Sequence, residues 1–150
     1  MKILILGATG AAGTRLTAET LRRGHEVTAA SRSIRPGFIG RAQSAVLDGS
    51  SAAHVADLAQ EHDVVIGATR PAPGREEDID VVTAGIAEGT RRAGRRLVVV
   101  GAAPLRIPGT SWSALEDPVW VPRRFRAFAA PSSRQLESPT TPRGILSIGR

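Results

Sequence analysis

The chain has 150 residues, of which 41% are hydrophobic and 23% charged, and this length and composition suit one globular domain with a sizeable core. It contains no cysteine, which excludes disulfides, thiolate catalysis and cysteine-based metal sites, and its three histidines lack metal-ligand spacing, so we expect no metal. No apolar run is long enough for a signal peptide or a membrane span, which predicts a cytoplasmic protein without a membrane partner.

The net charge of +6 comes entirely from the second part of the chain. Residues 1–90 hold 9 basic and 11 acidic side chains, whereas residues 91–150 hold 11 basic and 3 acidic ones. All but one of the 20 basic residues are arginine and asparagine is absent, a usage typical of a GC-rich coding sequence. The basic part carries no recognisable nucleic-acid motif, so the charge predicts no nucleic-acid partner.

The first predicted element is an apolar strand over residues 3–6, which runs directly into a glycine-rich turn over residues 7–13. Gly7 allows a sharp reversal, Gly10 lets a pyrophosphate approach the backbone, and Gly13 lets the next helix pack closely on the first strand. The turn therefore predicts the phosphate-binding part of a dinucleotide site. The alternative is a turn that only links strand to helix.

A helix over residues 14–23 is predicted next. Its Leu16, Ala18 and Leu21 are expected to face the sheet, and Gly24 to end it. The N-terminus of such a helix supplies free N–H groups and the positive end of a dipole, both of which favour an anion.

The remaining elements alternate along residues 26–101. Strands are predicted at residues 26–30, 45–47, 63–67 and 97–101, and helices at residues 52–60 and 78–93. Apolar strands separated by helices indicate a parallel sheet covered on both faces. Right-handed crossovers and one reversal then give the strand order 3-2-1-4-5 of an α/β, Rossmann-type doubly wound fold.

The last third of the chain differs in kind. Seven of the ten prolines in the sequence lie within residues 102–150, and no further strong strand is predicted there. We therefore expect one dinucleotide-binding domain over residues 1–137, with a regular part at 1–101 and an irregular, proline-rich extension at 102–137. Residues 138–150 are predicted to be a flexible tail.

Ligands of such sheets bind outside the carboxyl ends of the strands, so the residues after each strand are the candidate site residues. An acidic side chain about 20 residues after the glycines would bind the free ribose hydroxyls of NAD, but Ser31 and Arg32 stand there instead. A guanidinium and a hydroxyl match a 2′-phosphate, which predicts NADP(H) in preference to NAD(H). The alternative is that Arg32 is a solvated loop arginine.

Together these residues resemble an atypical short-chain dehydrogenase/reductase of the NmrA-like, NAD(P)H-binding flavin-reductase (biliverdin-reductase-B-like) branch. The resemblance is carried by residues 2–13, Ser31 and Arg32, Asp48, residues 64–68 and residues 97–101. It implies the pyrophosphate at Gly7, Thr9, Gly10, Ala11, Ala12 and Gly13, the 2′-phosphate at Ser31 and Arg32, the adenine at Asp48 and Gly49, and the nicotinamide at Ala68, Thr69 and Arg70.

The chain departs from this family where catalysis is expected. It has no tyrosine and its only lysine is Lys2, so the Tyr/Lys pair that main-branch relatives use for proton transfer is absent. A serine-containing turn after the fifth strand is replaced by Gly101-Ala102-Ala103, which leaves Thr110 and Ser111 as candidate catalytic hydroxyls. Relatives are also longer, so the chain resembles a member that is truncated or diverged at its C-terminus.

The function predicted first is an NADPH-dependent oxidoreductase that transfers hydride to a flavin, a quinone or a similar small acceptor. Hydride transfer needs mainly orientation and exclusion of water, so the missing Tyr/Lys pair does not abolish it. Two alternatives stay open. One is a non-enzymatic NADP-sensing regulator of NmrA type with a protein partner, and the other is an inactive remnant of the fold.

Overall fold

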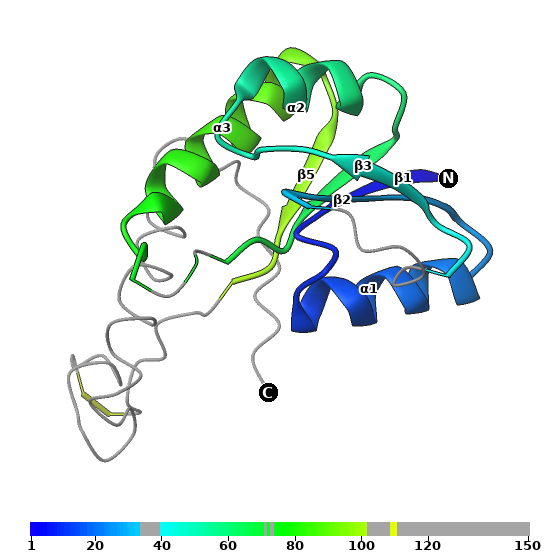
Figure 1. The fold of residues 1–150 in the computed structure, drawn as a ribbon, viewed down its shortest axis with the longest axis horizontal. Helices are drawn as coiled ribbons and strands as arrows, with labels where there is room; N and C mark the ends of the chain where they lie inside the picture. Colours follow the sequence, from blue (N-terminus) through cyan, green and yellow to red (C-terminus); the bar gives the residue numbers. More distant parts are fainter. Residues whose placement is uncertain (34–39, 71, 73, 102–108, 111–150) are drawn as a thin grey trace.

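The structure of the protein is a computed structural model that describes residues 1–33, 40–70, 72, 74–101 and 109–110. Within this part of the chain eight elements are formed (Figure 1). In chain order they are β1 (Lys2–Leu6), α1 (Ala11–Arg22), β2 (Glu26–Ser31), β3 (Gln43–Val46), α2 (Ala52–Ala59), β4 (Val64–Gly67), α3 (Asp78–Arg92) and β5 (Arg96–Val99).

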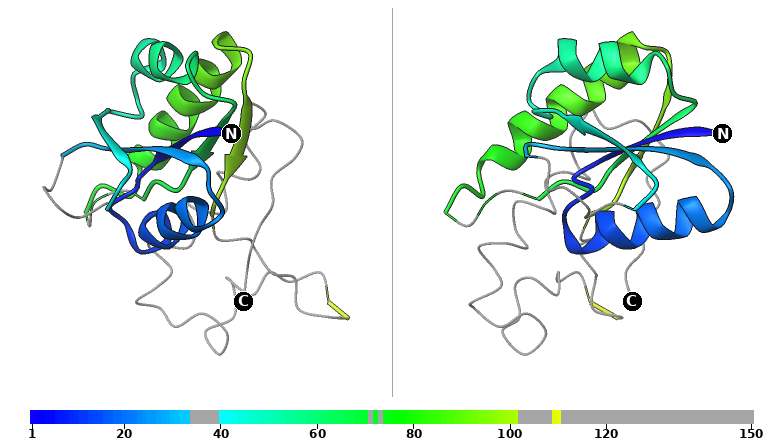
Figure 2. Two further views of the ribbon diagram at one scale, coloured as in Figure 1. Left: turned by 90° about the vertical axis from the view of Figure 1, so that its right-hand side faces the viewer. Right: turned by 45° about the vertical axis from the view of Figure 1, so that its right-hand side comes forward.

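The five strands form one parallel sheet in the order β3-β2-β1-β4-β5, which confirms the predicted Rossmann-type α/β topology. Leu6 at the end of β1 pairs with Ala30 of β2 and Gly67 of β4, so the carboxyl ends of the three central strands lie level. Helix α1 lies on one face of the sheet, and α2 and α3 lie together on the other (Figure 2). The turns that leave these level strand ends therefore meet at one edge.

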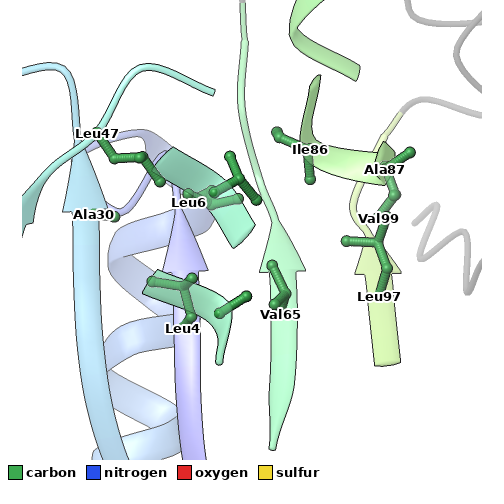
Figure 3. Close-up of a cluster of buried hydrophobic side chains, with 11 residues drawn as sticks. Leu4, Leu6, Ala30, Leu47, Val65, Ile86, Ala87, Leu97 and Val99 are labelled. Carbon is green, nitrogen blue, oxygen red and sulfur yellow. The ribbon is translucent and has the colours of Figure 1, made fainter. Parts of the chain in front are cut away.

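Strand β1 has buried side chains on both faces of the sheet. Its side chains alternate, with Leu4 and Leu6 in the core beneath α2 and α3 (Figure 3) and Ile3 and Ile5 in the core beneath α1. All four are buried. Truncating a fully buried leucine such as Leu4 to alanine typically costs about 2–5 kcal/mol of stability, so these side chains hold the central strand in place.

All the predicted elements are present, but their ends are shifted, and the side of α1 that faces the sheet was predicted wrongly. Helix α1 begins at Ala11 rather than at residue 14, because Gly10 already serves as its N-cap and alanine is a strong helix former. Ala18, expected to face the sheet, is exposed. The small polar Thr17 and Thr20 occupy the buried face instead, in phase with Gly13, because the face is set by that close-packed glycine.

A buried histidine joins the end of α2 to the sheet. The ring of His62 lies 2.7 Å from the carbonyl oxygen of Leu58 through Nδ1 and 2.7 Å from the hydroxyl of Thr28 through Nε2. Both ring nitrogens are thus paired within the fold, as buried polar groups normally are. His62 therefore has a structural role in place of a metal-binding one.

The predictions for the last third lie outside the described residues. They concern the extension at 102–137, the tail at 138–150 and the domain limit between them. Across the described segments, no helix is long and apolar enough to cross a membrane.

Candidate functional site

A cavity of about 600 Å³ opens at the carboxyl ends of β1, β2, β3 and β4. The site residues predicted from the sequence that line it are Gly7, Thr9, Gly10, Ser31, Arg32, Asp48, Gly49, Ala68, Thr69 and Arg70. They come from four separate segments of the chain, and the level strand ends bring them together. This is the position at which doubly wound sheets bind ligands, where the strand order reverses.

The glycine-rich turn is held tightly against its two neighbouring strands. The backbone N–H groups of Gly7 and Ala8 both donate to the carbonyl oxygen of Ala30, at 2.9 and 3.1 Å. Gly7 has a φ of +79°, and a Cβ atom there would lie 2.5 Å from the carbonyl oxygen of Ala68. Only glycine fits this position, so β2 and β4 fix the path of the turn.

Helix α1 presents an uncapped N-terminus beside this turn. The first hydrogen bond of the helix runs from the N–H of Thr14 to the carbonyl oxygen of Gly10 (2.9 Å). The N-cap residue, Gly10, has no side chain that could accept a hydrogen bond from the N–H groups of the first helical turn. The N–H groups of Ala11, Ala12 and Gly13 therefore have no partner among the residues described. These donors and the helix dipole favour a bound anion.

The other two helices contrast with α1 in this respect. The hydroxyl of Ser51 accepts from the N–H of His54 (3.4 Å) at the start of α2. Asp78 and Asp80 place negative charge in the first turn of α3. Within the described part of the chain, α1 is thus the helix whose N-terminus is neither capped by a side chain nor neutralised by an acid.

The ends of β2 and β3 form a charged rim. Ser31 is buried and its hydroxyl donates to the carbonyl oxygen of Ser33 (2.5 Å), whereas Arg32 is exposed and lines the cavity. The N–H of Ser50 donates to Asp48 Oδ1 (3.0 Å) and is the main cause that lowers the pKa of Asp48, aided by the Ser50 hydroxyl and by nearby Arg32. The rim therefore holds a stable carboxylate next to a guanidinium.

The end of β4 forms the opposite wall. Ala68 is fixed by its N–H, which donates to the carbonyl oxygen of Leu6 (2.8 Å). The hydroxyl of Thr69 is buried and has no hydrogen-bond partner in the described structure. Because buried hydroxyls normally have a partner, this one is a candidate for bonding to a ligand in the cavity.

Helix α3 supplies a wall that the sequence analysis missed. Ile79, Val81 and Val82 line the cavity together with Arg75 and Asp78, which form an ion pair at 2.7 Å. The helical spacing of Ile79 and Val82 indicated core packing, and they do pack inward, but α3 also extends past the carboxyl edge of the sheet (Figure 1). The exposed Val81, an apolar residue off the core face, was the available signal.

Some predicted site residues do not line the cavity. Ala11, Ala12 and Gly13 lie in the first turn of α1, where they can reach a ligand through their N–H groups. Thr110 is not among the lining residues, and Ser111 lies outside the described residues. No cluster of metal-ligating side chains is found among the residues that the structure describes.

Taken together, the cavity offers an anion site at the start of α1, cations along its rim and an apolar wall on α3. Such an arrangement can hold an extended, phosphorylated ligand with a flat aromatic end. The titratable groups along its described walls are three arginines and the carboxylates of Asp48 and Asp78.

Comparison with known proteins agrees with this geometry. A family model described as NAD(P)H-binding matches residues 7–136. The solved structure of a candidate exported protein from Burkholderia pseudomallei is 33% identical, has a TM-score of 0.76, and is matched over 91% of this chain and 65% of that one. A candidate NADH-flavin reductase from Streptococcus pneumoniae is 26% identical, with a TM-score of 0.69 and coverages of 91% and 64%.

The uncharacterised protein YwnB of Bacillus subtilis is 29% identical over 140 residues, which are 91% of this chain and 64% of that protein. The chain thus spans less than two thirds of the length of these relatives.

Proposed function

Because the chain belongs to the NAD(P)H-binding family, we propose that it is a reductase that holds NADP(H) in the cavity and reduces a flavin, a quinone or a similar flat acceptor. The observation that carries the proposal is the uncapped start of α1 beside the fixed turn at Gly7, because it is an anion site at the point where the strand order reverses. The similarity to a candidate NADH-flavin reductase supports the class of acceptor.

The residues around the cavity suggest the order in which the parts of the cofactor would be bound. The N–H groups of Ala11, Ala12 and Gly13 would hold the pyrophosphate, and Arg32, which is exposed and lines the cavity, would bind the 2′-phosphate. Asp48, Gly49 and the apolar wall of α3 would hold the adenine. Ala68 and Thr69, which follow β4, would hold the nicotinamide, and the Thr69 hydroxyl would be available to its carboxamide.

The chain contributes binding, orientation and exclusion of water. When bound, the dihydronicotinamide supplies the hydride. Gly7 and Ala68 fix the backbone that underlies the reacting end, and Thr69 orients it. Neither a tyrosine nor a second lysine is available in the sequence, so a Tyr/Lys pair cannot supply a proton to the acceptor.

The proposal is tested by following NADPH oxidation at 340 nm with FMN, riboflavin or a soluble quinone as acceptor. We expect turnover with at least one of these acceptors and slower turnover with NADH. Binding of NADP without turnover in any of the three assays would contradict the reductase and leave a nucleotide-binding protein.

That second candidate, a non-enzymatic NADP-sensing protein, is favoured by one observation. The sequence has no Tyr/Lys pair, although it keeps the glycine-rich turn at Gly7. A sensor would bind NADP and NADPH in the cavity and a protein partner elsewhere, with different affinities for that partner in the two redox states. An inactive remnant of the fold would bind neither nucleotide.

A cytoplasmic location stays a prediction, since one similar solved structure is that of a candidate exported protein. Fractionation of the native host's cells with an antibody to the chain tests it, and recovery from the periplasmic or extracellular fraction would contradict it.

A further inference from the structure

Helix α3 touches the backbone of the segment that follows β3, and it does so at Gly85. A Cβ atom at this position would lie 2.6 Å from the carbonyl oxygen of Ser50 and even closer to that of Gly49. The atoms in the way are backbone, so no rotation of a side chain can relieve the contact. Gly85 is buried in the middle of α3 and lies outside the cavity lining.

The segment that Gly85 supports is the Asp48–Ser50 turn, and it is fixed on its other sides as well. The N–H of Leu47 donates to the carbonyl oxygen of Ser31 (3.0 Å), and the N–H of Ser51 donates to the carbonyl oxygen of Asp48 (3.1 Å). All three residues of the turn line the cavity. The position of the turn is therefore fixed by its bond to β2, by the hydrogen bond within the turn and by its contact with α3.

A second contact between the same two segments shows how close this packing is. A Cβ atom on Gly49 would lie 3.1 Å from Cγ1 of Val82 and 3.3 Å from the side chain of Ile86. The turn and α3 therefore pack closely at two glycines, Gly49 in the turn and Gly85 in the helix. Neither segment can move toward the other without displacing it.

We infer that Gly85 is a positioning residue for the adenosine half of the dinucleotide, which it never touches. This inference rests on the proposed function, because it needs adenine to lie at Asp48 and Gly49. A methyl group at residue 85 must move the turn or the helix by about 1 Å to restore a normal C···O distance. Displacements of that size are enough to disrupt a bound geometry.

The experiment separates the two halves of the cofactor. Affinities for 2′,5′-ADP, which carries the adenosine half, and for NMN, which carries the nicotinamide half, are measured by calorimetry. In Gly85→Ala we expect 2′,5′-ADP to bind at least tenfold more weakly and NMN to change less than twofold. A role that is only structural would not divide the two halves in this way.

Gly89→Ala is the matched control, one helical turn further along α3. A Cβ atom there would lie 2.6 Å from the carbonyl oxygen of Ala52 and 2.6 Å from Cβ of Val55, both in α2. The added methyl strains the α2–α3 contact without touching the turn. We expect Gly89→Ala to lower the melting temperature as Gly85→Ala does, with less than a twofold change in 2′,5′-ADP affinity.

A milder variant covers the case in which Gly85→Ala does not fold. Gly49→Ala presses the same turn against side-chain atoms that can yield, and we expect a threefold loss of 2′,5′-ADP affinity. Ile86→Val in the same chain shortens one of these side chains, outside the cavity lining, and should partly restore the affinity. Unchanged affinity in a folded Gly85→Ala, or equal losses in the two glycine variants of α3, would overturn the inference. Failure of the unmodified chain to bind 2′,5′-ADP would instead overturn the proposed function.

Discussion

The backbone N–H of Leu47 donates to the carbonyl oxygen of Ser31 at 3.0 Å, which ties the end of β3 to the end of β2. The next residue in each segment, Asp48 and Arg32, is consequently held at the same rim of the cavity. Their proximity is reflected in the lowered pKa of Asp48, to which the Ser50 N–H contributes most and Arg32 adds. The rim therefore carries both a carboxylate and a guanidinium.

Arg32→Asp is expected to weaken NADP binding about a hundredfold and to change NAD binding less than threefold. The substitution replaces a partner of the 2′-phosphate by a like charge, and charge-assisted bonds of this kind contribute about 1.5–3 kcal/mol each. Fluorescence titration with both cofactors measures the ratio. Arg96→Asp, exposed at the opposite end of the sheet, makes the same charge change as a control. Equal losses for NADP and NAD would mean that Arg32 is a solvated arginine.

Gly10→Val is expected to abolish NADP binding in a folded protein. Gly10 is exposed at the N-cap with a φ of −77°, which any residue adopts, so we expect the fold to tolerate a side chain there. The branched side chain would occupy the space in front of the start of α1. Gly10→Ala, whose Cβ would lie 3.3 Å from the carbonyl oxygen of Gly7, should show a smaller loss. Calorimetry with circular dichroism tests both, and a folded valine variant with unchanged affinity would remove the turn from the site.

Gly13→Ala is expected to lower stability by about 1–3 kcal/mol, as overpacking of a tight contact does. The new Cβ atom would lie 2.7 Å from Cα of Ala8 and even closer to the carbonyl oxygen of Gly7, and backbone atoms cannot turn away. Urea unfolding measures the change. Ala18→Gly, exposed on the same helix, should cost about 1 kcal/mol through helix propensity alone. A smaller loss for Gly13→Ala than for Ala18→Gly would contradict the tight packing.

Glu19 is expected to titrate far below a normal glutamate. Arg22 and Arg23 both bond its carboxylate at 2.7 Å and lower its pKa from 4.5 to about 2, with Arg22 the larger cause. Since the folded pKa is the lower one, the contribution of these pairs to stability is present above pH 4.5 and is lost as the pH falls toward 2. Carboxyl ¹³C shifts report the titration directly.

The matched variants for this titration are Arg22→Gln and Arg91→Gln. The first should raise the pKa of Glu19 and leave Glu88 unchanged. The second should raise the pKa of Glu88, which Arg91 and Arg92 hold at about 2 in the same way, and leave Glu19 unchanged. An unaltered Glu19 titration in Arg22→Gln would show that the ion pair does not form in solution.

Deletion of residues 138–150 is expected to change neither the melting temperature nor the NADP affinity. A domain limit near residue 137 is the prediction that this deletion tests. Differential scanning fluorimetry with and without NADP measures both quantities. A loss of several degrees in the shortened chain would show that these residues belong to the domain.

The family, the strand order and the existence of each element could be predicted from the sequence, because they depend on features that are local in the chain. An apolar strand that runs into Gly7, Gly10 and Gly13 is typical of a dinucleotide-binding unit, and the family match over residues 7–136 confirms the family that these residues indicated. The helix over 78–93 was likewise predicted within one residue of each end, since Gly94 marks its end clearly.

What the sequence did not reveal depends on distances between segments. The exposure of Ala18 was missed because hydrophobicity alone does not show that Gly13 sets the sheet-facing side of α1. The role of Gly85 was missed for a similar reason, since a glycine inside a helix differs from a weak helix residue only when its neighbour, here Gly49, is known. The wall that Val81 adds to the cavity depends on how far α3 extends past the sheet.

The register of β1 bears on how the chain is made in the cell. β1 lies in the middle of the sheet, yet Ile3 pairs with Val64, and Lys2 N–H bonds to Asp63 Oδ2 across 61 positions of the chain. At a synthesis rate of about 5–20 residues per second, β4, the second strand that pairs with β1, is synthesised roughly 3–12 s after β1. During that interval one edge of an apolar strand is open to any other extended segment, including that of a neighbouring nascent chain. Slow translation between β2 and β4 would prolong this exposure, and a chaperone that shields short apolar strands would shorten it.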